Sequence, residues 1–210
     1  MQVSTRHKFI FLSNRKCGSS ALTTALTPHC SMVLRNDYRL RHTNFAELQE
    51  YIMPFLKARL GDELADYQVY AMMREPTEWA YSWYRFRSRP MLADAGHPNH
   101  KVYTGDVSWE DFLGEFGKRQ KDRKPFANLS HQNKFLTGRD GTNNGLTIYR
   151  YEDYDAFVSM LEDRIGKSLN MERRNVSPER SDKIKASDYQ VGEKIFAQDY
   201  ALYRALEKRS

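Results

Sequence analysis

Short apolar runs alternate with longer segments in which apolar residues recur at helical spacing. Four of these runs predict strands, at residues 8–13, 30–35, 67–73 and 146–151. The first run, KFIFLS, is apolar enough to be buried on both faces, as strands of parallel sheets are. Because helical segments separate the strands, the chain predicts an α/β fold with a mainly parallel central sheet.

Capping and breaking residues delimit the predicted helices. The pattern predicts helices over residues 19–27, 44–60, 76–89, 108–116, 128–136, 152–166 and 186–208. Asn44 with Glu47 has the spacing of a capping box, and Pro54 predicts a kink or a break within that helix. Residues 90–107 and 138–145 are rich in turn-forming residues and predict loops. With no repeat and no linker, we expect a single domain over residues 1–210.

Composition restricts the function only loosely. With 40% hydrophobic residues the chain should fold, and its net charge of +6 suits an anionic partner without choosing one. No apolar run approaches the roughly 18 residues of a membrane span, and the first fifteen residues do not resemble a secretory signal. We therefore expect a cytoplasmic protein without a membrane span. The two cysteines predict no disulfide framework, and Cys17 is expected to be a packing residue.

A strand, a basic turn and a helix rich in small residues follow one another over residues 8–26. In an open α/β sheet, such a turn lies at the carboxyl ends of the strands, where ligands bind. The N–H groups of Gly18, Ser19 and Ser20 can donate to a phosphate at the helix start, and Lys16 adds a positive charge. The same residues also fit an ordinary capped helix. The pattern G-x-x-x-x-G-K-[ST] of nucleotide kinases and GTPases is not present here.

A second strand-to-helix turn follows the strand at 67–73. Arg74 directly follows this strand, Pro76 lies in the first turn of the predicted helix, and Ser82 lies about two helical turns further on. A guanidinium group suits a phosphate because it can donate two hydrogen bonds at once. Taken alone, each residue is better explained without a ligand, Arg74 as a solvated arginine and Ser82 as a packed helical serine.

Together the two segments resemble the nucleotide-binding motifs of sulfotransferases. FLSNRKCGSSAL is similar to the family's phosphosulfate loop, P-K-[ST]-G-[GT]-[TS]-[SW]-L, and REPTEWAYSWYR resembles its 3′-phosphate motif, R-[DN]-P-x-x-R-x-x-S-x-Y. Three later segments show a weaker similarity to sulfotransferase segments, in the same order along the chain: YRYEDYDAF, NVSPER and the ending FAQDYALYRAL. The chain departs from the motifs at three positions. Arg15 stands where the family usually has Pro, Glu75 where it has Asp or Asn, and Trp79 where it has Arg.

This resemblance implies a P-loop-like three-layer fold and a metal-independent sulfotransferase. The donor would be 3′-phosphoadenosine 5′-phosphosulfate, adenosine 3′,5′-bisphosphate the product, and the acceptor a hydroxyl or amine of a small molecule or carbohydrate. By the match, Lys16 stabilises charge on the leaving phosphate, and Arg74 and Ser82 hold the 3′-phosphate. The remaining residues matched to the donor-binding loop are Arg15, Cys17, Gly18, Ser19 and Ser20.

The acceptor also needs a base to take its proton. His42 is the first candidate, because RHTNFAEL resembles the [KR]-H-x-[TS]-like segment between the two motifs in carbohydrate-type members. His131, Glu47 and Glu75 remain alternatives.

Three other interpretations stay open. One is a nucleotide-dependent, kinase-like phosphotransferase that uses Mg²⁺. Another is a basic nucleic-acid-binding module that uses KRQKDRK and WYRFRSR, although we expect no nucleic-acid partner. The third is a sulfotransferase-like protein that binds the nucleotide without catalysis.

Overall fold

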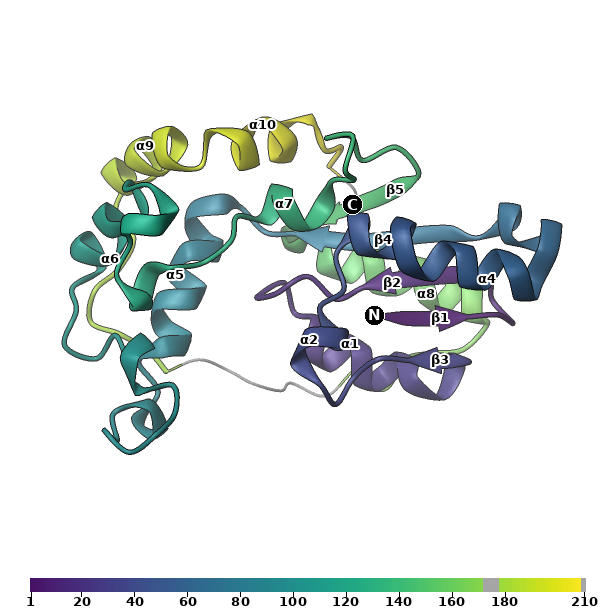
Figure 1. Ribbon diagram of the computed structural model, residues 1–210, viewed down its shortest axis with the longest axis horizontal. Helices are drawn as coiled ribbons and strands as arrows, with labels where there is room; N and C mark the ends of the chain where they lie inside the picture. The colour runs from purple at the N-terminus through teal and green to yellow at the C-terminus, as the bar shows by residue number, and fades with distance from the viewer. Residues whose placement is uncertain (172–177, 209–210) are drawn as a thin grey trace. The chain divides into compact units, whose positions relative to one another are not determined.

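A mixed sheet forms the centre of the protein's first compact unit. In the computed structural model, which describes residues 1–171 and 178–208, the five strands are ordered β3-β1-β2-β4-β5 (Figure 1). They are β1 (Gln2–Ser4), β2 (Phe9–Leu12), β3 (Met32–Val33), β4 (Gln68–Met73) and β5 (Leu146–Arg150). β2, β4 and β5 pair in parallel, whereas β1 pairs antiparallel with both β2 and β3. Four strands therefore run in one direction, which confirms the mainly parallel α/β sheet.

All four predicted strands are present, and β1 is an additional one. β1 pairs with β2 in the register Gln2↔Phe11, Val3↔Ile10 and Ser4↔Phe9. Gln2 and Ser4 are completely buried, and Gln2 donates a hydrogen bond from Nε2 to the Thr23 carbonyl oxygen at 2.9 Å. Such a short strand with two polar residues carries no apolar run, so the hydrophobic pattern did not predict it.

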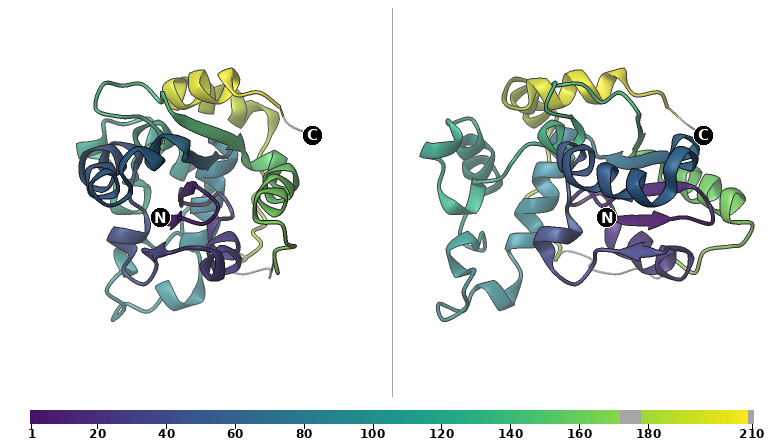
Figure 2. Two further views of the ribbon diagram at one scale, coloured as in Figure 1. Left: turned by 90° about the vertical axis from the view of Figure 1, so that its right-hand side faces the viewer. Right: turned by 45° about the vertical axis from the view of Figure 1, so that its right-hand side comes forward.

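Helices of the first unit cover both faces of the sheet. Alternate strand residues, such as Ile10 and Leu12, join a core with Phe45 and Leu48 on the side of α3 (Phe45–Glu47) and α4 (Met53–Leu60). On the other face, Phe11 packs against Phe157 of α8 (Tyr154–Ile165) with ring centres 5.9 Å apart. The left view of Figure 2 shows α4 and α8 on opposite sides of the sheet. This arrangement follows from the two-residue period of strands.

Helix boundaries follow the capping signals at several positions. Asn44 and Glu47 form the predicted capping box, Ser108 accepts from the Asp111 N–H, and Pro76 lies in the first turn of its helix. The remaining helices are α1 (Ser19–Leu26), α2 (Tyr38–Arg41), α5 (Pro76–Arg87), α6 (Trp109–Phe116), α7 (Gln132–Leu136), α9 (Ala186–Ile195) and α10 (Ala197–Ala205).

Three predicted helices differ from the observed ones. The helix expected at 44–60 is interrupted by a π-helical turn over Leu48–Ile52, and Pro54 lies in the first turn of α4. Proline has no N–H for an interior helical hydrogen bond, and the change from π-helical to α-helical hydrogen bonding occurs just before Pro54. The backbone stays helical across this change, so the chain is not broken there. The helix expected from residue 128 begins at Gln132, and the one expected over 186–208 is divided at the buried Phe196 into α9 and α10.

The chain divides into two compact units. The first holds Met1–Arg74, Gln132–Arg174 and Leu202–Ser210, and the second holds Glu75–His131 and Asn175–Ala201. The second unit has an aromatic core in which Tyr84 packs on Trp109 and Phe112, with ring centres 5.7 and 5.5 Å apart. That residues 1–210 fold as a single domain stays a prediction. Within the described part of the chain, no helix combines the length and the apolar character of a membrane span.

We predict that Phe157→Ala destabilises the protein by about 3–5 kcal/mol, the usual cost of removing a buried phenylalanine side chain. Phe157 is fully buried, and its ring centre lies 4.6 Å from that of Tyr149 and 6.0 Å from that of Tyr70. Thermal or urea unfolding measures the loss. Phe55→Ala is the matched control, because Phe55 is 50% exposed on α4 and should change stability little. Equal losses in the two variants would contradict the assignment of Phe157 to the core.

Candidate functional site

The turn between β2 and α1 has the backbone of an anion-binding turn. Lys16 and Gly18 both have positive φ angles, 63° and 66°. Gly18 is the N-cap residue of α1, no side chain caps this end, and the first helical turn contains no acidic residue. The first N–H groups of a helix have no partner within the helix, and the helix dipole favours negative charge there. The backbone of the turn is therefore suited to an anion, and the binding of one stays a prediction.

Two tyrosine rings lie against Gly18. A Cβ atom at this position would come within 2.8 Å of Tyr154 Cε2 and 3.0 Å of Tyr151 Cε2. Such distances are too short for ordinary carbon contacts, and the positive φ is also unfavourable for residues with a Cβ. Glycine is therefore required here for two reasons: its backbone conformation and the close approach of the rings.

Gln132 links the carboxyl ends of β2 and β4. It is 1% exposed, and its Nε2 donates to the Arg74 carbonyl oxygen at 2.8 Å. Its Oε1 accepts from the Arg74 N–H at 3.1 Å and from Asn14 Nδ2 at 3.3 Å. Asn14 Nδ2 also donates to the Met72 carbonyl oxygen at 3.0 Å. These buried amides satisfy main-chain groups at the end of β4, and the bond between Gln132 and Asn14 ties that end to the turn after β2.

Arg74 lies beside the turn after β2. Its guanidinium carbon lies 4.9 Å from the centre of the Tyr151 ring, and Tyr151 also contacts Gly18. The structure thus brings Arg74 to the same edge of the sheet as residues 15–20, as both strand-to-helix turns predicted. Arg74 is a cation at this edge, and its guanidinium can bind an oxyanion with two hydrogen bonds.

Cys17 is a packing residue of the turn. Burial raises the pKa of its thiol to about 12, although the nearby Arg74 acts in the opposite direction. The thiol donates to the Arg15 carbonyl oxygen at 3.4 Å, and its side chain has no exposed surface. A thiol with this pKa is protonated at neutral pH and is a poor nucleophile. The residue as a whole is 0% exposed, so its place among the donor-binding residues stays a prediction from the resemblance.

The other turn residues differ in their exposure. Arg15 is exposed, Lys16 and Ser20 are partly exposed, and Ser19 is buried with 5% of its surface exposed. The Ser20 hydroxyl accepts a hydrogen bond from Arg41 Nη2 at 2.8 Å. Arg41, from α2, therefore adds a further cation beside the start of α1.

His42 also lies at this edge of the sheet. It follows α2, and its Nδ1 is 2.6 Å from the Ser13 carbonyl oxygen, which can only accept. Nδ1 therefore carries the hydrogen, and Nε2 keeps its lone pair. The pKa of His42 is lowered to about 4, mainly by burial and in smaller part by the charges of Arg15 and Arg41. His42 is thus a neutral imidazole at physiological pH.

The alternative bases have structural roles. Glu47 accepts from the Asn44 N–H at 2.8 Å in the capping box. In the second unit, Glu75 caps α5 through the Glu78 N–H at 2.7 Å and also accepts from the Tyr200 hydroxyl.

Three further residues from the sequence motifs belong to the second unit. His131 packs against Phe116 and Phe196, with ring centres 6.1 and 5.5 Å away. Ser82 is partly exposed on α5, and Trp79 is 2% exposed in the aromatic core. The site described in the first unit therefore includes Arg74 but not Ser82, whose part in it stays a prediction.

Of the segments with weaker similarity to the family, YRYEDYDAF (residues 149–157) contributes directly to the site. It includes Tyr151 and Tyr154, the two rings on Gly18. Residues 175–177 of NVSPER lie outside the described residues, whereas Arg180 hydrogen-bonds the Gly105 carbonyl oxygen in the second unit at 3.0 Å. Among the residues that the structure describes, no three His, Cys, Asp or Glu side chains are grouped to hold a metal ion.

Sequence reasoning missed the residues that position the turn. Asn14 directly follows a buried strand, so its polar side chain was a local signal. Arg41 precedes the candidate base and could also have been considered. Gln132 had no such signal, because its partner Asn14 is 118 positions away.

We predict that Gly18→Ala destabilises the protein more than Gly141→Ala does. Both glycines have positive φ, 66° and 77°, but a Cβ at Gly141 meets nothing within 4 Å. Backbone strain is common to both variants, so the difference between their free energies of unfolding reports the contact with Tyr151 and Tyr154. Thermal unfolding of the two variants measures it. Equal destabilisation would show that the rings do not restrict Gly18.

We predict that His42 titrates near pH 4 in an NMR pH series. An unfolded histidine titrates near 6.5, so between these values the unfolded chain takes up a proton that the folded chain excludes. The stability advantage of the wild type over His42→Gln should therefore be complete above pH 6.5 and shrink as the pH falls toward 4. A midpoint near 6.5, or a pH-independent difference, would contradict the burial of His42.

Comparison with known proteins assigns no family to the chain. A scan against protein-family models, a search of curated proteins and a search of solved structures found no match. What this edge of the sheet can do therefore follows from its own residues: a helix start suited to an anion, flanking cations and a neutral imidazole.

Proposed function

We propose that the chain is a sulfotransferase that uses 3′-phosphoadenosine 5′-phosphosulfate as donor. One observation carries the proposal: the turn at residues 15–20 and Arg74, which follow neighbouring parallel strands, lie at one edge of the sheet and are linked through Gln132. A donor with phosphates at two positions of its ribose needs two groups of donors and cations. The order of the two motifs along the chain supports the same family.

The start of α1 would bind the 5′-phosphate. The N–H groups of Gly18, Ser19 and Ser20 would provide donors, and Arg15 and Lys16 would provide positive charge. Cys17 is assigned to this loop on the sequence resemblance alone. Arg74 would bind the 3′-phosphate, with Ser82 of the second unit assigned to the same phosphate on the sequence resemblance alone. The strand, turn and helix over 9–26, within a sheet covered on both faces, support the finer expectation of a P-loop-like three-layer fold.

Lys16 would act on the leaving group. During transfer, the bond between sulfur and the bridging oxygen breaks, the acceptor oxygen or nitrogen bonds to sulfur, and adenosine 3′,5′-bisphosphate leaves with the electron pair. Its negative charge grows in the transition state, so an ammonium group beside it lowers the barrier more than it strengthens ground-state binding. The left-handed backbone at Lys16 belongs to the turn that would hold this phosphate.

His42 would take the proton of the acceptor. Its Nε2 has a free lone pair because Nδ1–H donates to the Ser13 carbonyl oxygen. That hydrogen bond also stabilises the imidazolium formed after proton transfer. A pKa of about 4 makes the imidazole a weak base in the ligand-free protein, and the negative charge of bound phosphates would raise it.

We predict that Lys16→Ala lowers sulfuryl transfer by about 10²–10³-fold, the usual effect of removing one transition-state donor, while adenosine 3′,5′-bisphosphate still binds. Arg74→Ala should weaken binding of this nucleotide by about 10–100-fold, because a hydrogen bond to a charged group contributes about 1.5–3 kcal/mol. Calorimetry measures binding, and transfer of labelled sulfate to an acceptor panel measures activity. Lys57→Ala is the control, since Lys57 lies exposed on α4 in an ion pair with Asp62.

The wild type should bind adenosine 3′,5′-bisphosphate more tightly than AMP or ATP. Preference for ATP with Mg²⁺ would favour the phosphotransferase instead. Steeply salt-dependent binding to DNA or RNA without nucleotide preference would favour the nucleic-acid-binding module. Either result would overturn the sulfotransferase proposal.

A further inference from the structure

Two arginines beside α1, Arg35 and Arg41, are assigned to neither the 5′-phosphate nor the 3′-phosphate of the proposed donor. Arg41 Nη2 donates to the Ser20 hydroxyl at 2.8 Å, and Arg35 Nη2 donates to the Thr24 hydroxyl at 3.2 Å. Ser20 and Thr24 are one helical turn apart, so both arginines lie along the same face of α1. The Thr24 hydroxyl donates to the Ser20 carbonyl oxygen at 3.1 Å, which leaves its oxygen lone pairs to accept from Arg35.

These two arginines carry uncompensated charge. Among the described residues, no carboxylate lies within ion-pair distance of Arg35 or Arg41, and the charge of Arg35, after burial, contributes to a lowered pKa of Arg41. The nearest acid along the chain, Asp37, is occupied: its carboxylate accepts from Arg39 Nε at 3.0 Å and Nη2 at 2.6 Å. Two close cations without a counter-ion attract an anion from solution.

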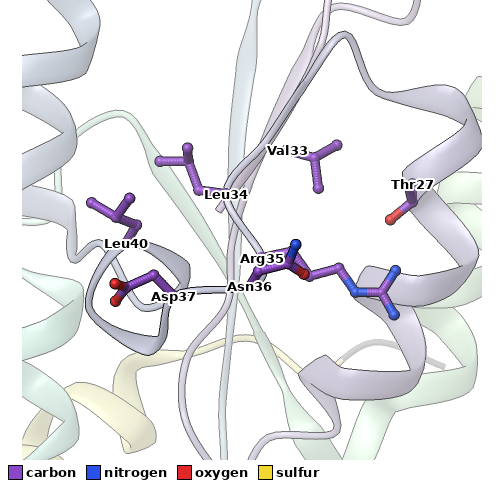
Figure 3. A pocket seen from close by; sticks show the side chains of 7 residues that line it. All are labelled: Thr27, Val33, Leu34, Arg35, Asn36, Asp37 and Leu40. Carbon is purple, nitrogen blue, oxygen red and sulfur yellow. The ribbon is translucent and has the colours of Figure 1, made fainter.

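An open pocket is lined in part by Arg35, and Arg41 directly follows another of its lining residues, Leu40. It has a volume of about 510 Å³, which is within the range of small-molecule sites. Figure 3 shows Leu34 and Leu40 on one side of the backbone and the Arg35 side chain extending toward α1, which precedes Thr27. The residues that line the pocket are Thr27, Val33, Leu34, Arg35, Asn36, Asp37 and Leu40. Its aliphatic side chains suit an apolar body, and Arg35 makes one side of it cationic.

The pocket is continuous in sequence with the proposed base. Leu40, which is 54% exposed, lies in α2, and Arg41 and His42 follow it directly. A ligand in this pocket would therefore contact the chain segment that also carries Arg41 and His42. This position suits an acceptor, because the phosphates of the donor are assigned to the start of α1 and to Arg74.

We propose that Arg35, Arg41 and the adjoining pocket bind the acceptor, and that this acceptor is an organic acid with an apolar body. Its carboxylate or similar oxyanion would lie on the two guanidinium groups, and its apolar body against Val33, Leu34 and Leu40. The identification of the ligand as acceptor rests on the proposed function, whereas the binding of an amphipathic anion does not.

The test compares 2-naphthoate with its neutral isostere 2-naphthamide. Calorimetry with the full chain, with and without saturating adenosine 3′,5′-bisphosphate, should show naphthoate binding at least about tenfold tighter than the amide, since hydrogen bonds to charged groups exceed neutral ones. Arg35→Ala and Arg41→Ala should each weaken naphthoate by roughly tenfold and leave the amide unchanged. Arg59→Ala removes the same charge from α4 in the same unit and should affect neither probe.

Leu40→Ser tests the apolar part of the site. Because Leu40 is largely exposed, the variant should fold, and it should weaken both probes equally. Equal affinities for acid and amide, equal losses in Arg35→Ala and Arg59→Ala, or displacement of naphthoate by the nucleotide would each overturn the inference. Displacement would place the arginines in the donor site. Failure of the proposed function appears separately, as no nucleotide binding by the wild type.

Discussion

The candidate site depends on a buried set of amide hydrogen bonds centred on Gln132. One side chain pairs with both main-chain groups of Arg74 and accepts from Asn14, so the ends of β2 and β4 have a fixed spacing. Leaving such groups unpaired inside the protein would cost about 1–3 kcal/mol each. The network therefore positions two cationic turns without a charged side chain of its own, and the phosphate-binding hypothesis rests on this arrangement.

Most of the fold was predictable because its signals are local. KFIFLS, YQVYAMM and LTIYRY are apolar runs bounded by polar turns, and each forms a strand of the sheet. Asn44 with Glu47 and Pro54 set helix boundaries through hydrogen bonds made or lost within four residues. β1 was not predictable in this way, because Gln2 and Ser4 are buried by partners on α1 and near His29 rather than by a hydrophobic pattern.

The candidate site was predictable only in part. Glycine and serine after a strand indicate an anion-binding turn, and Arg74 follows a strand in the same manner, so both could be found from sequence. The contacts that bring them together involve Gln132, Tyr151 and Tyr154, which lie more than a hundred residues from the turn. Burial also changes chemistry that residue type alone suggests: His42 has a pKa of about 4 and Cys17 a pKa of about 12.

The hydrogen bonds between Arg74 and Gln132 also connect the two residues that flank the 75–131 segment. Arg74 and Gln132 are the residues of the first unit on either side of this segment. The segment therefore begins and ends beside two residues that are hydrogen-bonded to each other. A segment with its ends joined in this way can change in length or composition at little cost to the strands that flank it, because their spacing is set outside it. The edge of the sheet that carries the two turns can then keep its geometry while the 75–131 segment changes.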